Sequence, residues 1–165
     1  MTITSEFRIG QGFDVHPYSS DPDRQLILGG VTFPPPGLVG HSDSDVIAHA
    51  VTDAILGAAG LGDIGSMFSD TDPAYAGADS IRLLEAATQK VQASGWVVVN
   101  VDCTVVLDSP KIAPHRDAMI DRLSGAVGAP VSVKGKRSEG IGALGRGEGV
   151  VCFANALISR PDLSK

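Results

Sequence analysis

The stretch WVVVNVDCTVVLD, at residues 96–108, indicates the fold class most directly. Valine is enriched in strands, and the partial alternation of apolar and polar residues predicts a buried β-strand. A helix is predicted on each side of it. The first covers residues 79–94 and ends at Gly95, and the second opens at Pro114 and runs to about residue 127. The centre of the chain is therefore predicted to be helix, strand, helix.

The remaining elements extend this pattern in both directions. A helix over residues 43–59 has an apolar stripe, and Ser42 or Asp43 is its expected cap. Further strands are predicted at residues 7–16, 131–137 and 149–159, and residues 25–33 are expected to form a short strand or a hairpin arm. The order β, β, α, α, β, α, β, β predicts an α+β fold in which helices cover one face of a sheet. Residues 1–165 are expected to form a single domain.

The second face of this sheet also needs cover. Residues 97–106, VVVNVDCTVV, are apolar on both alternating sets of side chains. Because successive side chains of a strand point to opposite faces, such a strand is typically buried on both sides. The helices account for one face only. The other face is therefore expected to pack against another subunit, so the sequence predicts an oligomer.

Length and composition are those of a soluble globular domain, with 165 residues, of which 43% are hydrophobic and 19% charged. A net charge of −6 argues against general attraction to nucleic acid or to an anionic membrane. No apolar run approaches the roughly 20 residues that span a bilayer, and the N-terminal sequence lacks the features of a signal peptide. Cys103 and Cys152 lie in apolar strand-like runs and are predicted to be buried free thiols. A cytoplasmic location is expected.

Three residues in the first third of the chain are candidate ligands of one metal ion. Asp14 and His16 are two apart in FDVH, so in a strand both side chains leave the same face. Phe13 and Val15 would then face the other way, into a core. His49 lies about one turn into the predicted helix. Two imidazoles and one carboxylate suit zinc and leave a fourth position open for water or substrate. The alternative is that each histidine is simply a packed or surface residue.

The segment HSDSD, at the start of that helix, is dense in polar atoms. His41 and Ser42 would lie where free N–H groups and the helix dipole favour an anion such as phosphate, although plain capping is an equal alternative. Asp45 and Asp53 each lie four residues from His49. Either carboxylate could orient the imidazole, or both could be solvated residues of the helix surface.

Loop carboxylates form a second group of candidates. Asp63, Asp70 and Asp72 in GDIGSMFSDTD could bind a sugar hydroxyl or a hard cation, although aspartate is also common in turns and the spacing does not match an EF-hand. Glu139 follows a predicted strand. It comes directly after three possible phosphate donors, Lys136, Arg137 and Ser138.

Two further segments carry weaker signals. In SPKIAPH, Lys111 could supply a positive charge where a strand leads into a helix. GRGEG does not connect a strand to a helix, so a dinucleotide-binding fold is rejected and a glycine-rich loop is expected. Arg146 and Glu148 within it are a possible ion pair.

The ordered segments RIGQGFDVH, HSDSDVIAHAVTDAILGAAGLGDIG, FSDTDP, GADS, PKIAPH and GRGEG resemble the 2-C-methyl-D-erythritol 2,4-cyclodiphosphate synthases. The similarity runs over residues 7–159, and the block at residues 41–72 is long and specific. The resemblance implies a phosphorus–oxygen lyase of the methylerythritol phosphate route to isoprenoids. In its reaction the 2-phosphate of 4-diphosphocytidyl-2-C-methyl-D-erythritol 2-phosphate attacks the β-phosphorus, and CMP leaves. It also implies a homotrimer whose sheets meet around the trimer axis, with active sites between subunits.

The same resemblance implies roles for individual residues. The implied catalytic residues are the zinc ligands Asp14, His16 and His49, the phosphate-binding His41, and Glu139, which would bind a magnesium or manganese ion. Substrate contacts are implied for Ser42 at a phosphate; for Asp63 and Gly65 at the methylerythritol hydroxyls; for Pro110, Lys111, Ile112 and Ala113 in a cytidine pocket from the neighbouring subunit; and for Phe68, Asp70, Asp72, Lys136, Arg137, Ser138 and Arg146.

The chain departs from the family pattern at several positions. GKRSE stands where relatives often have A-T-T-T-E, so Lys136 and Arg137 replace two threonine hydroxyls. Positive charge at these positions would compensate for the lost hydroxyl contacts to phosphate. Ala143 or Leu144 replaces an aromatic residue before GRGEG, and Ser69 replaces a proline.

Two other functions remain alternatives at this point. One is a zinc-dependent phosphohydrolase that uses zinc-bound hydroxide on a nucleotide diphosphate. The other is a non-catalytic metal-bound trimer that binds a nucleotide or an isoprenoid phosphate, which only the altered GKRSE segment favours.

Overall fold

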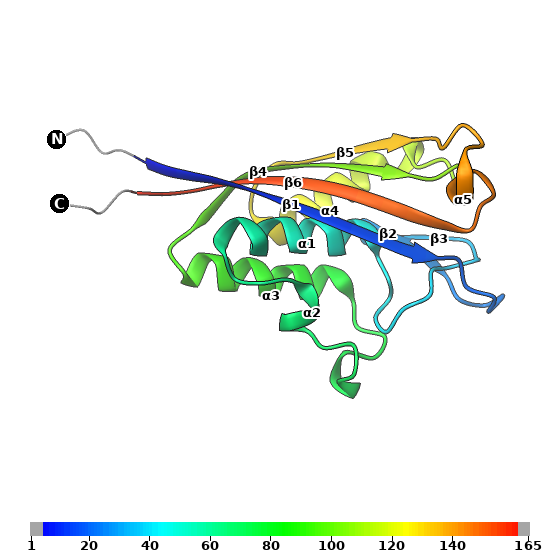
Figure 1. Cartoon of the computed structure of the whole chain (residues 1–165), viewed down its shortest axis with the longest axis horizontal. Helices are drawn as coiled ribbons and strands as arrows, with labels where there is room; N and C mark the ends of the chain where they lie inside the picture. The colour runs from blue at the N-terminus through cyan, green and yellow to red at the C-terminus, as the bar shows by residue number, and fades with distance from the viewer. Residues whose placement is uncertain (1–4, 162–165) are drawn as a thin grey trace.

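The structure is a computed structural model that describes residues 5–161. Its main sheet has four strands in the order β1–β6–β4–β5 (Figure 1). The strands are β1 (Ser5–Pro17), β4 (Val97–Val106), β5 (Val131–Lys136) and β6 (Gly149–Pro161). Antiparallel pairs join β1 to β6 and β6 to β4, whereas β4 and β5 are parallel. The sheet is therefore mixed, and its first and last strands lie side by side.

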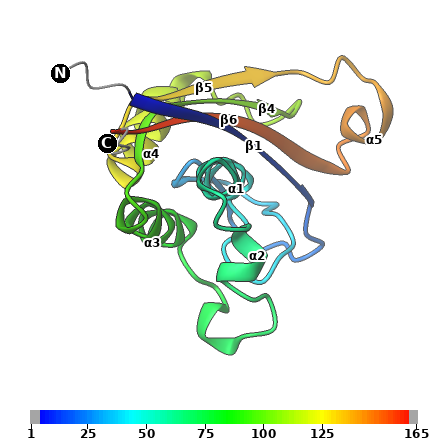
Figure 2. The same cartoon turned by 60° about the vertical axis from the view of Figure 1, so that its left-hand side comes forward.

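Three helices cover one face of this sheet (Figures 1 and 2). They are α1 (Val46–Ala59), α3 (Ser80–Ala93) and α4 (Arg116–Val127). The short elements are β2 (Leu26–Leu28), β3 (Val31–Phe33), α2 (Ile64–Met67), η1 (Pro73–Tyr75), η2 (Ala113–His115) and α5 (Gly142–Gly145). β2 and β3 pair with each other in a separate ribbon. The predicted α+β class, with helices on one face of the sheet, is confirmed.

The hydrophobic core lies between the helices and the sheet. It is built mainly from aliphatic side chains, such as the fully buried Ile55 of α1 and Val105 of β4. Cys103 and Cys152 are free and buried, as predicted. Over the part of the chain that the structure describes, no helix combines the length and the apolar character needed to cross a membrane.

Helix α1 begins three residues later than predicted, and its cap is Asp45 rather than Ser42 or Asp43. Ser44 has a φ of +60°, which interrupts any helix that would start before it. The buried Asp45 carboxylate accepts hydrogen bonds from two N–H groups of α1, and also from the N–H groups of Gly29 and Gly30 at 2.8 and 2.6 Å. The cap therefore also ties the β2–β3 turn to the start of α1.

Two glycines allow β1 to lie directly against α1. A Cβ atom at Gly12 would lie 1.8 Å from the carbonyl oxygen of Ala50, and one at Gly10 would lie 2.1 Å from that of Ala54. Since side chains alternate along a strand, the even-numbered residues of β1 face the helix. Asp14, two residues beyond Gly12, therefore points toward the first turn of α1.

We expect Gly12→Ala to destabilise the fold, because the new methyl group meets helix backbone that cannot rotate away. Overpacking of this kind costs about 1–3 kcal/mol. The measurement is the free energy of unfolding in urea. Gly57→Ala is the matched control, since a Cβ there has only one neighbour, the Gln11 carbonyl oxygen at 3.9 Å, and alanine favours a helix. A Gly12→Ala protein as stable as the parent would contradict this packing.

The face of the sheet opposite the helices carries large exposed apolar side chains. They are Phe7, Ile9, Phe13, Val15, Val97 and Phe153. The prediction that Phe13 and Val15 enter the core is wrong for the single chain, in which they are 49% and 51% exposed. Phe13 instead contacts Phe153 across the β1–β6 pair, with ring centroids 5.1 Å apart. The predicted second apolar face therefore exists, and the described chain leaves it uncovered.

Candidate metal centre

Asp14, His16 and His49 converge on one point, as their spacing predicted. Oδ2 of Asp14 lies 3.0 Å from Nε2 of His16 and 3.0 Å from Nδ1 of His49. One potential ligand atom from each of the three residues lies within 4.8 Å of the other two. The strand β1 supplies two of them and the first turn of α1 supplies the third. The side chain of His49 is the least exposed, at 11%.

Hydrogen bonds determine which nitrogen of His16 faces this point. Its Nδ1 lies 2.6 Å from the carbonyl oxygen of Val39. A carbonyl can only accept, so Nδ1 carries a proton and donates it. In the neutral ring Nε2 then presents a lone pair toward Asp14. This arrangement, in which one ring nitrogen binds the backbone and the other faces the centre, is typical of metal-ligating histidine.

The electrostatics of the centre favour a cation. Burial raises the pKa of Asp14, but hydrogen bonds and charge from His16 and His49 outweigh it and lower that pKa to about 2. Asp14 is therefore a carboxylate at neutral pH. Its Oδ2 lies at hydrogen-bond distance from one nitrogen of each imidazole. If those nitrogens carried no proton, their lone pairs would face the negatively charged oxygen, which is unfavourable. A positive charge among the three groups satisfies this contact. Burial lowers the pKa of His16 but its contact with Asp14 raises it further, so a protonated imidazole is one source of that charge. A divalent metal with two nitrogen ligands and one oxygen ligand would be another.

A pocket of about 300 Å³ surrounds the centre. The predicted residues that line it with the three ligands are His41, Ser42, Gly65, Phe68 and Asp70. Sequence reasoning missed its apolar members Ile64, Tyr75 and Leu83. The rings of Phe68 and Tyr75 contact each other, with centroids 5.3 Å apart, so one side of the pocket is aromatic. The irregular sequence around Tyr75 contained no periodic signal that could have placed it there.

Two of the predicted loop carboxylates do not line this pocket. Asp63 caps α2 by accepting from the N–H of Ser66 at 2.7 Å, and Asp72 caps η1 through the N–H of Ala74 at 2.9 Å. These local contacts agree with the alternative that aspartate here serves the turns of the loop. The backbone of Asp72 still reaches the site, because its carbonyl oxygen lies 2.8 Å from Nε2 of His41.

Of the two alternatives for Asp45 and Asp53, orientation of His49 is wrong for both, because the His49 ring bonds to Asp14, Ser42 and Ser80. The alternative of a solvated residue is wrong for Asp45. Asp45 is fully buried as the cap of α1, and Asp53 accepts from the N–H of Ile64 at 2.7 Å. Nε2 of His49 instead lies 2.8 Å from Oγ of Ser80, a residue that the sequence analysis did not select.

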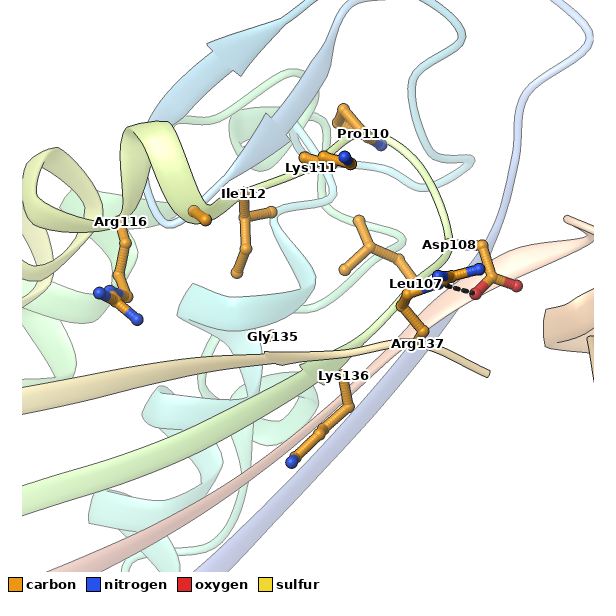
Figure 3. A pocket seen from close by; sticks show the side chains of 10 residues that line it. Leu107, Asp108, Pro110, Lys111, Ile112, Arg116, Gly135, Lys136 and Arg137 are labelled. Carbon is orange, nitrogen blue, oxygen red and sulfur yellow. Dashed lines mark ion pairs between the residues drawn. The ribbon is translucent and has the colours of Figure 1, made fainter. Parts of the chain in front are cut away.

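A second pocket, of about 480 Å³, lies where β4 and β5 end (Figure 3). Its lining includes all four residues predicted for cytidine, Pro110, Lys111, Ile112 and Ala113, together with Arg116, Lys136 and Arg137. The Ile112 side chain lies against Gly135, where an added Cβ would be 3.0 Å from it. Next in β5, Lys136 extends from the opposite side of the strand, as Figure 3 shows.

Arg137 and Ser138, two further predicted residues in this region, both contact the Asp108 carboxylate. Arg137 pairs with Asp108 at 3.8 Å, and the hydroxyl and the N–H of Ser138 both donate to the same carboxylate. Glu139 is exposed, has a φ of +54°, and lines neither of the two pockets. The predicted ion pair of Arg146 and Glu148 is confirmed, with Nε and Oε1 2.6 Å apart.

The fold and the three converging ligands define an α+β protein with a candidate metal centre. The chain belongs to the YgbB family, whose model matches residues 7–159. This match confirms the resemblance found in the sequence segments. It also covers every residue of both pockets.

Relatives and solved structures agree with this assignment. Proteins named 2-C-methyl-D-erythritol 2,4-cyclodiphosphate synthase match from Azoarcus sp. (53% identity, 94% of this chain, 98% of the relative) and Bordetella petrii (55% identity, 93% and 96%). The bifunctional IspDF of Campylobacter jejuni superposes with a TM-score of 0.90 at 39% identity, over 95% of this chain and 43% of that one. A CDP-bound 2-C-methyl-D-erythritol 2,4-cyclodiphosphate synthase has a TM-score of 0.81 at 40% identity, over 92% and 99%.

Proposed function

We propose that this protein converts 4-diphosphocytidyl-2-C-methyl-D-erythritol 2-phosphate to 2-C-methyl-D-erythritol 2,4-cyclodiphosphate and CMP. An oxygen of the 2-phosphate forms a bond to the β-phosphorus, and the bond from that phosphorus to the CMP oxygen breaks. CMP leaves with the electron pair, and no water is consumed, so the enzyme is a phosphorus–oxygen lyase. The observation that carries this proposal is the convergence of Asp14, His16 and His49 in a pocket that also contains His41 and Ser42.

The protein residues act by binding and orientation. A zinc ion held by Asp14, His16 and His49 would supply positive charge to phosphate groups that otherwise repel one another. His41 and Ser42 face the same pocket and would hold a phosphate through their N–H and O–H groups. No protein nucleophile is needed, because the attacking oxygen belongs to the substrate. The rate gain would come from alignment and electrostatic stabilisation.

The second pocket is the proposed site of the cytidine. Its apolar residues Ile112 and Ala113 lie beside the basic residues Lys111 and Arg116, a combination that suits a base and the phosphate attached to it. A related synthase has been solved with CDP bound. We place this pocket next to the metal centre of a neighbouring subunit in a homotrimer that acts in the cytoplasm. The uncovered apolar face of the sheet supports such an assembly.

Glu139 is the residue proposed to hold a second divalent ion, magnesium or manganese, which would supply positive charge to the diphosphate of the substrate. Glu139→Gln preserves the size of the side chain and removes its charge. We expect the magnesium concentration for half-maximal CMP release to rise at least about tenfold, while zinc binding stays unchanged. The measurement is a magnesium titration of the rate. An unchanged magnesium curve for Glu139→Gln would rule out this metal role.

Lys136 and Arg137 offer a second comparison in the same titration. If they face the diphosphate in the assembly, Lys136→Thr with Arg137→Thr should raise the magnesium requirement further. Arg137 already pairs with Asp108, and Lys136 lies on the side of β5 opposite Ile112. We therefore expect the double variant to need the same magnesium concentration for half-maximal rate as the parent.

One assay tests the proposed function against the alternatives. Purified protein is incubated with the cytidine diphosphate substrate in the presence of zinc and magnesium, and CMP and the second product are identified. We expect CMP and the cyclic diphosphate in equal amounts. A linear bisphosphate product would indicate the phosphohydrolase, and binding without turnover would indicate the non-catalytic trimer.

A further inference from the structure

The side of His49 that faces away from the metal centre contacts a chain of two polar side chains, Ser80 and then Asp43. Nε2 of His49 lies 2.8 Å from Oγ of Ser80, and that hydroxyl donates its proton to Oδ1 of Asp43. Ser80 is 1% exposed. The chain connects α1, which carries His49, to the first residue of α3 and to the loop before α1.

The direction of these hydrogen bonds follows from counting protons. A carboxylate can only accept, so the single proton of the Ser80 hydroxyl is committed to Asp43. The hydroxyl oxygen then presents a lone pair to His49. Nε2 of His49 must therefore donate to it and carry the proton. Nδ1, which lies 3.0 Å from Asp14, is left as the nitrogen that can offer a lone pair to a metal.

Backbone hydrogen bonds hold the carboxylate of Asp43 in place. It accepts from the N–H of Ser80 at 3.1 Å and from the N–H of Asp45 at 3.1 Å. The N–H of Asp43 itself donates to the carbonyl oxygen of Ala78 at 3.0 Å. Both carboxylate oxygens thus have fixed partners at the starts of two helices. The hydrogen-bonded chain of His49, Ser80 and Asp43 therefore cannot shift without moving α1 against α3.

Ser42 is the only other described side chain with a hydrogen bond to this nitrogen, and it is the weaker partner. Its Oγ lies 3.2 Å from Nε2 of His49 and accepts from the N–H of Ser44 at 3.1 Å. A proton donated by Ser42 would demand the opposite tautomer of His49. The shorter contact to Ser80, whose proton is already committed, decides between the two.

We propose that Ser80 and Asp43 are positioning residues of the metal centre, which fix the tautomer and orientation of His49 so that Nδ1 binds the metal. Oxygen partners of this kind raise the basicity of a ligating imidazole and limit its rotation. The inference rests on the metal centre of the proposed function, but it does not depend on the proposed cyclisation reaction. A protein that binds zinc in this way and releases no CMP would leave it intact.

The test uses zinc alone as the probe and the full-length protein. Metal-free parent, Ser80→Ala and Asp43→Asn proteins are titrated with zinc in competition with a chromogenic chelator. Loss of such a partner typically weakens metal binding about 10–100-fold, and we expect a loss in this range for Ser80→Ala and a smaller one for Asp43→Asn. The control is Thr88→Val, which removes another buried hydroxyl of α3; among the described residues, the only hydrogen-bond partner of that hydroxyl is the Leu84 carbonyl oxygen.

A spectroscopic measurement on the unmutated protein keeps the test independent of variant folding. In ¹⁵N NMR of the zinc-loaded parent, we expect the ring proton of His49 on Nε2, protected from solvent exchange, and we expect faster exchange in Ser80→Ala. The proposal is overturned if that proton is found on Nδ1. It is equally overturned if Ser80→Ala binds zinc as the parent does, or if Thr88→Val loses as much affinity as Ser80→Ala.

Discussion

Replacing His49 with alanine is expected to abolish turnover, with CMP release falling by more than about a thousandfold. A bound metal supplies several kcal/mol of charge stabilisation in such reactions, and each 1.36 kcal/mol is a factor of ten in rate. Asp14 and His16 alone would hold zinc weakly, so zinc content should also fall well below one per subunit. The fold should persist, because the hydrogen-bonding partners of the His49 side chain are polar groups of the site.

Zinc content, CMP release and circular dichroism are measured together on the same preparation. Thr52→Val is the matched control, since it changes a buried side chain of α1 whose hydroxyl bonds, within residues 5–161, only to the Ala48 carbonyl oxygen. A His49→Ala protein with one zinc per subunit and normal turnover would show that the proposed metal centre is wrong.

Charging the uncovered face of the sheet is expected to dissociate the proposed trimer and to abolish activity with it. Ile9 and Phe153 are 82% and 40% exposed in the single chain, so Ile9→Lys with Phe153→Lys costs the monomer little. In an assembly that covers this face, each substitution forfeits about 1.5–3 kcal/mol of apolar burial and buries a charge. Activity should be lost because the cytidine pocket and the metal centre would belong to different subunits.

Sedimentation velocity and CMP release at working concentration provide the measurement. Gln92→Lys adds one positive charge on the exposed surface of α3, and we expect it to leave both assembly and rate as in the parent. A double variant that sediments as the parent does would show that this face is not the interface. A well-folded, active monomer would contradict the proposal of shared active sites.

The elements of the fold were largely predictable because each carries a local signal. Helix α3 was predicted within a residue at each end, since Asp79 caps it and Gly95 follows it. The start of α1 was not predictable, because Ser44 adopts a left-handed backbone for reasons of tertiary contact. The buried Asp45 gains four N–H donors only after the β2–β3 turn has packed against α1.

The metal centre was predictable in part, because two of its three ligands also carry a local signal in the sequence. Alternation along β1 places Asp14 and His16 on one face, and this rule needs no knowledge of the rest of the chain. The same rule placed Phe13 and Val15 on the other face but could not tell whether a core or an open surface lies there. The contact of Ser80 with His49 could not be predicted from the sequence, because the two residues are 31 positions apart and lie on different helices.

Whether oxygen from water enters the products is the most direct test of the proposed cyclisation. Purified enzyme is incubated with its proposed substrate, zinc and magnesium in water enriched in ¹⁸O, and both products are analysed by mass spectrometry. Attack by the 2-phosphate of the substrate predicts CMP and cyclic diphosphate that both contain only ¹⁶O. Incorporation of one ¹⁸O into either product at the rate of turnover would show attack by water, and would contradict the proposed cyclisation.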